Sequence, residues 1–493
     1  MTEELKHVHD ISKKDRPFLI LLMFIPCIFV MFSNLDNDIW FLLNHGRYVL
    51  ENGIPHIEPF TIHQGFEFMM QQWLSASIFW IIYSTFGAVG LKFLVMLCYG
   101  LIVFVIYKLC MKISGDYFFV SYSVSLVISV MLIMFMVARP YIFSTLIFVL
   151  ELYFLESFIL SNNKKYLYFL PVLSVLLINL HAAMWPMLFV IVVPYFIDSF
   201  KFRIGPLSGQ GYEKKSLLLA IGTMILVGFL NPYGLEAMTY LFRSYGYEEI
   251  NMTVSEMKTP FINAGLGMMV YGSMLIVVLL YCVYRKGTTK LRYTLLTLGT
   301  AYMAISSSKS FLLFAICGLF PLTYYLKGFV PPVKQNNVKK TMFLRKILIG
   351  IIMLLILVSV YKFQESSVII NHEYKLLNDT IHFVLEQKDA KKVKLYTGYN
   401  DGGIAEFQGI PSYIDARAEV FLKSNNKKED IMKEYIQMQA GSIYYKDVLD
   451  KYKFTHLIVT ENDILYTYLK HDKDYEISYS NEKYTLFEPI NGE

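Results

Sequence analysis

The sequence has little charge for its length. Only 17% of its 493 residues are Asp, Glu, Lys or Arg, whereas 55% are apolar; about a quarter of a typical soluble domain is charged. Apolar runs such as 18–33, 118–137 and 141–155 contain almost no charge and approach the length that crosses a hydrocarbon core of roughly 30 Å. This composition excludes a single soluble fold and predicts a mainly α polytopic membrane protein.

Cysteine is also scarce. The five cysteines all fall in or beside apolar runs, at Cys27, Cys98, Cys110, Cys282 and Cys317. The polar tail after Phe363 has none, which excludes a disulfide framework or a Cys-based metal site there. No small-residue cleavage site follows the first apolar run, so this run is predicted to be a retained span and not a signal peptide.

The basic residues alternate along the chain. They gather at 6–16, 108–112, 164–165, 201–215, 285–292 and 334–346. Placing all of these clusters in the cytoplasm gives a threading with about eleven crossings, the N-terminus inside and the C-terminus outside. Richness in Lys, Asn and Ile fits a bacterium with an AT-rich genome, and the predicted location is the bacterial plasma membrane.

Two domains are predicted. Residues 1–363 form a transmembrane helical bundle that includes a first outer loop at 34–73, and residues 364–493 form a small extracytoplasmic α/β domain. The tail alternates helical stretches with short strand-like runs, the latter at 392–397, 412–415, 456–460, 475–479 and 483–488. Within the bundle, residues 73–83 are bounded by Gly87 and Gly90 and predict an interfacial helix before the next span.

The first outer loop opens with Asp36 and Asp38, directly after a span. A carboxylate at the membrane edge can bind a cation or hold a proton, and either state serves acid/base chemistry. The alternative is a solvated loop start, where Asp is common.

Other polar residues stand alone on the predicted outer side. Arg139 is flanked by long apolar runs and is costly there unless it meets an anion, for which a guanidinium suits a phosphate; alternatively it snorkels to the headgroups. Lys309 is a second isolated cation on this side. Asn179 and His181 are further polar residues there, although His181 could simply cap a helical hairpin.

The order of these features resembles bacterial membrane glycosyltransferases of the GT-C superfamily, the group related to protein mannosyltransferases and lipid A aminoarabinose transferases. The resemblance runs through the loop 36–74, Arg139 to Tyr141 with Glu151, Asn179 to His181, Leu230 to Gly234, and the tail segments 399–403 and 414–417. It therefore covers nearly the whole chain.

The resemblance implies transfer of a sugar from a polyprenyl-phosphate carrier to a glycan, glycolipid or protein acceptor on the outer face, with inversion at the anomeric carbon. Asp36 or Asp38 would be the catalytic base and a tentative Mg²⁺ or Mn²⁺ ligand. Substrate binding would fall to Arg139, Asn179, His181, Lys309, Glu58 and Tyr233. The remaining partners would be membrane lipids, and no nucleic acid is expected.

The sequence departs from the family pattern at three places. The loop ends in Gln71 and Gln72 where the family usually has His-Glu, and neutral amides cannot act as general bases. Glu58 replaces the Asp of an Asp-Pro-Phe segment, and Ala416 replaces the Gly of an Asp-Gly-Arg segment. Altered substrate handling and loss of activity both remain open.

Two further functions compete with the transferase. A flippase or transporter for a lipid-linked sugar would favour two related halves with polar groups at the midplane, and no half-repeat is visible in the sequence. A non-catalytic scaffold in envelope assembly is favoured by the Gln71 and Gln72 replacements and disfavoured by the presence of Asp36, Asp38 and Arg139.

Overall fold

The computed structural model describes residues 15–33, 35–244, 253–261, 289–327 and 372–490, together with isolated positions between 247 and 350. The chain divides into two compact units. The first comprises Met1–Ser33, Lys92–Gly234 and Ser255–Gln364, and the second comprises Asn34–Leu91, Leu235–Val254 and Glu365–Glu493. The predicted domain boundary at residues 363 and 364 lies outside the described residues.

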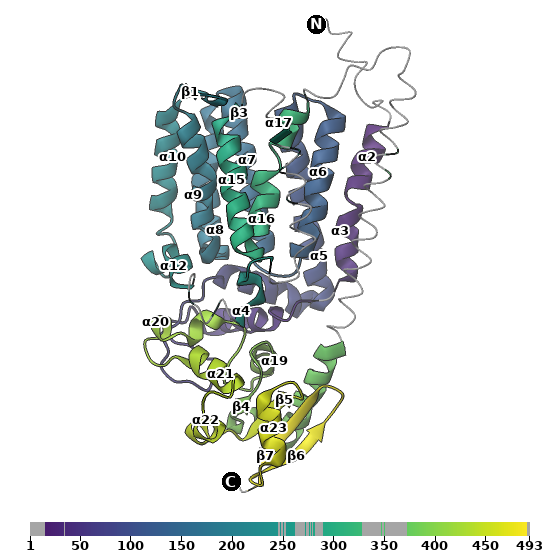
Figure 1. Ribbon diagram of the computed structural model, residues 1–493, viewed down its shortest axis with the longest axis vertical. Coiled ribbons are helices and arrows are strands. Elements are labelled where there is room, and N and C mark those ends of the chain that lie inside the picture. The colour runs from purple at the N-terminus through teal and green to yellow at the C-terminus, as the bar shows by residue number, and fades with distance from the viewer. Residues whose placement is uncertain are drawn as a thin grey trace, which may run out of the picture. The chain divides into compact units, whose positions relative to one another are not determined.

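The first unit is built from apolar helices. Its principal elements are α2 (Arg16–Met23), α3 (Ile25–Phe29), the second part of α5 (Trp73–Ser114), α6 (Phe118–Leu132), α7 (Tyr141–Ser161), α8 (Phe169–Leu180), α9 (Pro186–Asp198), α10 (Lys214–Val227), α15 (Leu291–Ser306), α16 (Phe311–Leu313) and α17 (Leu322–Leu326). Helix α8 packs against α7 and α10, and α15 packs against α9, so that these helices run side by side (Figure 1). Three short strands, β1 (Phe202–Ile204), β2 (Leu207–Gly209) and β3 (Thr289–Lys290), form a sheet in the order β1-β2-β3.

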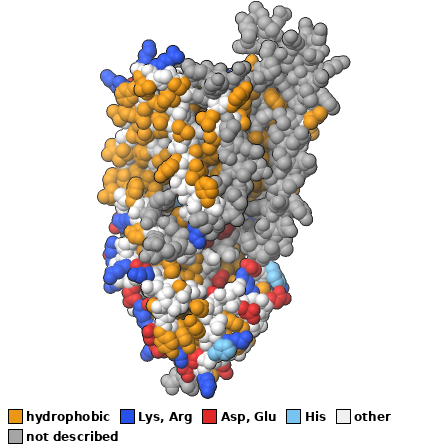
Figure 2. Space-filling model, viewed as in Figure 1, with side chains coloured by type: hydrophobic (Ala, Val, Ile, Leu, Met, Phe, Trp, Pro, Cys, Tyr) orange, Lys and Arg blue, Asp and Glu red, His pale blue; other side chains and the backbone are white. Residues whose placement is uncertain are grey.

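Several helices are suited to a membrane. Four of the described helices are long and apolar enough to cross one, namely Trp73–Ser114, Phe118–Phe135, Tyr141–Ser161 and Ser308–Leu326. Hydrophobic side chains cover the described part of the bundle on the face shown in Figure 2. Leu219 and Leu226 of α10 are 73% and 70% exposed. An apolar exposed face is stable in lipid and costly in water. The chain is therefore a multi-pass membrane protein, and the total of about eleven crossings stays a prediction.

Helix α5 consists of two helices joined at Gly87. The backbone there has φ 61° and ψ −157°, which only glycine adopts without strain. The break separates residues 73–86 from the long apolar stretch that follows, at the point where the sequence predicts an interfacial helix to end. The two parts also fall largely in different units, which divide after Leu91.

A buried ionic network fixes the interior of the first unit. Arg292 of α15 donates to Glu156 of α7 at 2.8 Å and to Asp198 of α9 at 2.8 Å, and all three side chains are fully buried. The sequence assigned Arg292 to a basic cytoplasmic connection at 285–292. The sidedness of this connection stays a prediction, and the Arg292 guanidinium itself is enclosed between three helices, where two carboxylates offset its desolvation.

The second unit combines the first loop with the tail. It contains α4 (Ile39–Asn52), the start of α5, α11 (Leu235–Met238), α12 (Tyr240–Ser244), a helix at 372–387, α19 (Gly402–Phe407), α20 (Lys423–Asn426), α21 (Ile431–Gln439), α22 (Tyr445–Tyr452) and α23 (Ile464–His471). Strands β4 (Leu395–Tyr396), β5 (His456–Thr460), β6 (Tyr475–Ser480) and β7 (Tyr484–Pro489) form a mixed sheet in the order β4-β5-β7-β6. Strand β5 has the predicted bounds, whereas 412–415 forms only isolated bridges, from Ser412 to Thr61 and Leu395.

Glycines allow the closest approach inside the second unit. A Cβ atom at Gly402 would lie 2.0 Å from the Ile414 carbonyl oxygen, and one at Gly403 would lie 3.3 Å from the Phe41 Cβ. These two glycines therefore serve to pack α19 against α4 and against the 412–415 segment. This role agrees with the sequence, which has no helix-opening GxGxxG pattern at this point.

Candidate functional site

In the first unit, cationic side chains gather where α7 begins. Pro140 occupies the position before α7, and Arg139 directly precedes it. Arg139 Nη1 donates to Glu256 Oε1 at 2.9 Å, with 19% of the Arg139 side chain and 46% of the Glu256 side chain exposed. The Arg139 guanidinium is thus held at the rim of the bundle by an acidic partner that the sequence analysis did not identify.

Tyr141, two residues after Arg139, contacts two more of the predicted site residues. The His181 ring meets the Tyr141 ring edge-on at a centroid distance of 4.9 Å, and the Lys309 Nζ lies 5.4 Å from the centroid of the Tyr141 ring. His181 Nδ1 is also 2.8 Å from Ser144 Oγ. Since Ser307 and Ser308 bond to the backbone oxygens of Glu256 and Lys258, the Lys309 turn is fixed beside the Arg139–Glu256 pair.

The structure therefore brings Arg139, His181 and Lys309 together. Among the described residues, two cationic side chains lie close to one carboxylate and one imidazole, a set with a formal positive charge that an anion would offset. Guanidinium and ammonium groups that converge in this way can bind a phosphate or stabilise negative charge that develops on a leaving phosphate. We refer to Arg139, Tyr141, His181, Glu256 and Lys309 as the cationic cluster.

Asn179 lies in the last turn of α8, and Tyr233 lies in the segment after α10, where its N–H donates to Asn231 Oδ1 at 2.8 Å. Asn179 Nδ2 donates to the Val175 and Leu230 carbonyl oxygens, both at 2.9 Å, which ties the end of α8 to the end of α10. Asn231 Nδ2 donates to Gly228 O and Gly234 O, and Gly234 has φ +56°. This segment closes a helix.

Asp36 and Asp38 belong to the second unit, at the start of α4. Asp38 N–H donates to Asp36 Oδ1 at 3.0 Å, and both side chains are half-buried. The charge of Asp38 also affects Tyr399. The Tyr399 hydroxyl donates a hydrogen bond of 2.7 Å to Ala416 O. Burial raises the pKa of the Tyr399 phenol well above its ordinary value, and the negative charges of Glu419 and Asp38 raise it further.

A second acidic residue lies in the same part of the second unit. Glu419 Oε1 accepts a hydrogen bond of 2.6 Å from the Tyr240 hydroxyl, and its charge reaches Tyr399 as that of Asp38 does. The sequence analysis did not identify Glu419. Its only local signal is its position two residues after Arg417, at the end of a segment that belongs to the family landmarks.

Metal binding would depend on Asp36 and Asp38. Within the described ranges, no group of three His, Cys, Asp or Glu side chains is assembled that could hold a metal ion. Two carboxylates are fewer ligands than Mg²⁺ or Mn²⁺ requires, so oxygen atoms of water and of a substrate phosphate would have to complete the coordination. The residues present therefore fit a shared site and not a metal site made by the protein alone.

Glu58 lies in a buried ionic cluster. Its carboxylate accepts hydrogen bonds from Phe60 N, Thr61 N and Thr61 Oγ1, and from Arg417 Nη1 at 2.9 Å. Arg417 also contacts Asp415 and Glu406, and the four ionic side chains are at most 3% exposed. A carboxylate that is surrounded in this way is suited to fixing the loop in place.

The charges in this cluster do not balance. Arg417 is the one cation that the structure places against Glu58, Glu406 and Asp415. Burial, together with the negative charge of Asp415, raises the pKa of Glu406 well above its ordinary value. Burial alone would raise the pKa of Asp415 too, but the Arg417 guanidinium holds it below its usual range. Of these two carboxyls, Glu406 is therefore the one that binds a proton more readily.

Comparison with known proteins gives matches at the level of structure. No protein-family model and no curated protein matches the chain. The Archaeoglobus fulgidus oligosaccharyltransferase tethered with an acceptor peptide matches with a TM-score of 0.61 and 12% identity, over 97% of this chain and 75% of that one. The AglB structure from A. fulgidus in complex with an inhibitory peptide and a dolichol-phosphate matches with a TM-score of 0.61 and 11% identity, over 91% and 70%.

A bacterial protein matches along almost its entire length. ArnT from Cupriavidus metallidurans bound to undecaprenyl phosphate gives a TM-score of 0.55 at 9% identity, over 97% of this chain and 98% of that one. AglB and ArnT are both members of the GT-C superfamily. At these identities the likeness concerns the fold, and it confirms the fold that the sequence resemblance predicted.

Proposed function

We propose that this chain, a multi-pass membrane protein with the fold of the GT-C glycosyltransferases, transfers a sugar from a polyprenyl-phosphate donor to a cell-envelope acceptor. The observation that carries the proposal is the cationic cluster, in which Arg139 and Lys309 converge beside His181 on a GT-C fold. Lipid phosphates bound to two proteins of the same fold add support, since they have the anionic group that such a cluster would bind.

Each group has one proposed role. Asp36 or Asp38 removes the proton from the acceptor hydroxyl as it attacks the anomeric carbon, and the configuration at that carbon inverts. Arg139 and Lys309 stabilise the lipid phosphate as it departs with the electrons of the broken bond. His181, held by Ser144, presents its second ring nitrogen as a further donor or acceptor.

The base assignment is tested in membranes supplied with a polyprenyl-phosphate sugar. Asp36→Asn, Asp38→Asn and the double variant keep the size of the side chain but remove its basicity. We expect the rate of transfer to fall by about 10²- to 10⁴-fold, the usual contribution of a general base, in the double variant and in one of the two single variants. Asp447→Asn, an exposed aspartate of α22, is the matched control. Full activity of the double variant would exclude both carboxylates as the base.

A divalent cation is proposed as a substrate-dependent partner. When bound, Mg²⁺ or Mn²⁺ would neutralise charge on the donor phosphate, and Asp36 and Asp38 would supply the protein's share of the ligands. Chelation should then abolish transfer, and added Mg²⁺ or Mn²⁺ should restore it. Transfer that is unaffected by chelators would restrict these aspartates to proton transfer.

The topology is proposed on the distribution of Lys and Arg alone. The N-terminus lies in the cytoplasm, and the tail lies on the outer face of the bacterial plasma membrane. Membrane-impermeant thiol labelling of a cysteine introduced at Asp447 in whole cells should succeed, whereas a cysteine introduced at Arg203 should be labelled only after lysis. The reverse pattern would invert the proposed topology.

A further inference from the structure

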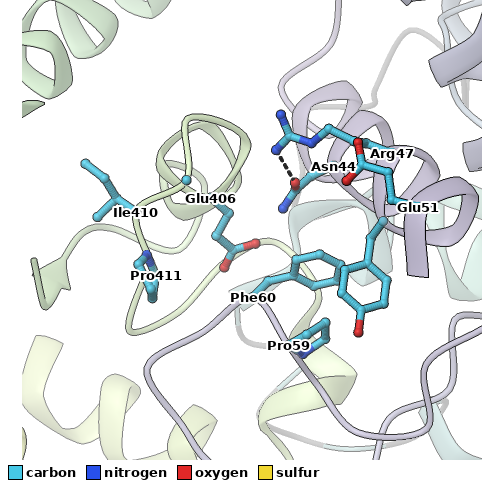
Figure 3. A pocket seen from close by; sticks show the side chains of 10 residues that line it. Asn44, Arg47, Glu51, Pro59, Phe60, Glu406, Ile410 and Pro411 are labelled. Atoms are coloured by element: carbon cyan, nitrogen blue, oxygen red, sulfur yellow. Dashed lines mark hydrogen bonds between the residues drawn. The ribbon is translucent and has the colours of Figure 1, made fainter. Parts of the chain in front are cut away.

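The second unit contains a cavity that none of the proposed catalytic residues line. It has a volume of about 450 Å³, within the range of about 300–1,000 Å³ that is usual for small-molecule sites. Helix α4 lines one wall with Asn44, Arg47, Tyr48 and Glu51. The spacing i, i+3, i+4 and i+7 places these four side chains on one face of the helix. Phe60 and Glu406 face them from the loop and from α19 (Figure 3).

The guanidinium of Arg47 is fixed at this wall. Its Nη2 donates to Asn44 Oδ1 at 2.7 Å and to Phe407 O at 3.1 Å. Its Cζ also lies 5.5 Å from the centroid of the Trp80 ring and 5.3 Å from that of Phe407. Only Nη2 of Arg47 forms hydrogen bonds to the described part of the chain, so Nε and Nη1 keep their donors for a ligand.

The opposite side of the cavity ends at a buried carboxyl group. Glu406 has 1% of its side chain exposed and accepts a hydrogen bond of 2.6 Å from Ser412 Oγ. Arg417 Nη2 lies 3.3 Å from Glu406 Oε2 and offsets its charge, and burial with the charge of Asp415 raises the pKa of Glu406 and so further disfavours the charged form. The charges that remain at the cavity are the cation of Arg47 and the anion of the exposed Glu51, which offset each other. An anionic ligand such as a phosphate gains little there.

The apolar part of the lining is aromatic. The Tyr48 and Phe60 rings both line the cavity and meet at a centroid distance of 5.3 Å and an angle of 74°. An aromatic face covers the C–H side of a sugar ring, while planar guanidinium, amide and carboxylate groups pair with its hydroxyls. Arg47, Asn44 and Glu51 provide such groups on one wall.

We propose that this cavity binds a neutral pyranose unit of the acceptor glycan. The proposal rests on the glycosyltransferase function above and adds to it the class of acceptor. In this role Tyr48 and Phe60 cover the apolar face of the sugar ring, and Arg47 and Glu51 bond to its hydroxyls. The cavity holds the acceptor through a sugar unit that does not react. Binding of this unit raises the local concentration of the acceptor hydroxyl that does react.

The test measures binding by saturation-transfer difference NMR, using the full-length protein in lipid nanodiscs without donor. The probes are chitotriose and cellotriose as neutral sugars and glycerol 3-phosphate as an anionic compound. We expect saturation transfer to at least one neutral sugar and none to glycerol 3-phosphate. Tyr48→Ala and Glu51→Ala should each weaken sugar binding by about tenfold, which corresponds to ~1.4 kcal/mol. Glu51 is exposed, so its variant should fold normally.

The matched control is Glu67→Ala, which removes an exposed glutamate of the same loop that does not line the cavity. It should bind the sugar as the unaltered protein does. The proposal is overturned if neither neutral sugar receives saturation, if only glycerol 3-phosphate does, or if binding is the same in Tyr48→Ala and Glu51→Ala. Sugar binding by a protein that transfers nothing would refute the proposed activity and leave the sugar site standing.

Discussion

Arg417 Nη1 donates a hydrogen bond of 2.9 Å to Glu58 Oε1, although the two residues lie 359 positions apart in the sequence. The Arg417 side chain is 3% exposed and that of Glu58 is fully buried. The pair joins the first loop to the tail inside one compact unit. A buried charge that loses its partner is far more costly than an exposed one, so the second unit depends on this contact.

Replacement of Arg417 by Met is therefore expected to destabilise the second unit. The variant leaves Glu58, Glu406 and Asp415 together without their cation, and breaking a buried ion pair costs about 3–5 kcal/mol. Thermal unfolding of the detergent-purified protein, combined with limited proteolysis of the tail, measures the effect. Lys433→Met, at an exposed position of α21, is the control. Equal unfolding temperatures of the two variants would contradict a structural role for Arg417.

Asp401 makes the stability of the second unit depend on pH. Burial raises the pKa of its carboxyl from 3.8 to about 7, against the opposing charge of Lys483, and the Tyr484 hydroxyl is 3.3 Å away. The pKa of Asp401 is higher in the folded protein than in the unfolded chain, so the folded state binds the proton more tightly. The contribution of this proton to the free energy of unfolding is therefore complete below about pH 4 and is lost as the pH rises to about 7. At 1.36 kcal/mol per pKa unit, the loss is at most about 4 kcal/mol, and partial exposure reduces it.

Unfolding of Asp401→Asn at pH 5 and pH 8 tests this dependence. The amide cannot ionise, so the variant should show a smaller loss of stability between the two pH values than the unaltered protein. Asp447→Asn should retain the full loss. If Asp401→Asn loses as much stability as the control does, another group is responsible for the pH dependence.

Local patterns in the sequence predicted much of the fold. Strand β5 and the helices of the first unit follow from runs of apolar residues with few breaks, and Gly87 ends the first part of α5 because its backbone adopts a positive φ. The resemblance in residue order identified Arg139 and His181, and the isolated charge in its serine-rich segment identified Lys309; the structure places His181 and Lys309 against Tyr141. These signals lie within a few residues of the features that they predict.

The long-range contacts could not be predicted in the same way. Glu256 as the partner of Arg139 and Arg417 as the partner of Glu58 have no local signal, because each pair forms only after distant segments pack. The buried partners of Arg292 have no local signal either, because its carboxylates come from α7 and α9. A single sequence carries no information on such pairings.

Gly46 is predicted to be essential for the packing of α4. A Cβ atom at this position would lie 2.1 Å from the Ala76 carbonyl oxygen in the first part of α5. Gly46→Ala must therefore push the two helices apart, and such overpacking costs about 1–3 kcal/mol or more. Gly222→Ala in α10 is the matched control, because nothing lies within 4 Å of its added Cβ and alanine favours the helix. Thermal unfolding should separate the two variants, and a neutral Gly46→Ala would contradict the close contact.

The Arg139–Glu256 pair gives a test of phosphate binding that separates function from structure. If Arg139 binds the donor phosphate, Arg139→Ala should reduce transfer at limiting donor by about 10- to 100-fold, since a hydrogen bond to a charged group contributes about 1.5–3 kcal/mol. Arg139→Lys should recover part of this loss, because it keeps the charge but not the planar fork.

Glu256→Gln removes the anion that competes for the guanidinium, so the KM for the donor should stay the same or fall. Arg203→Ala, an exposed arginine of β1, should leave transfer unchanged. If Glu256→Gln reduces transfer as much as Arg139→Ala does, the pair stabilises the rim of the bundle, and the donor phosphate binds elsewhere.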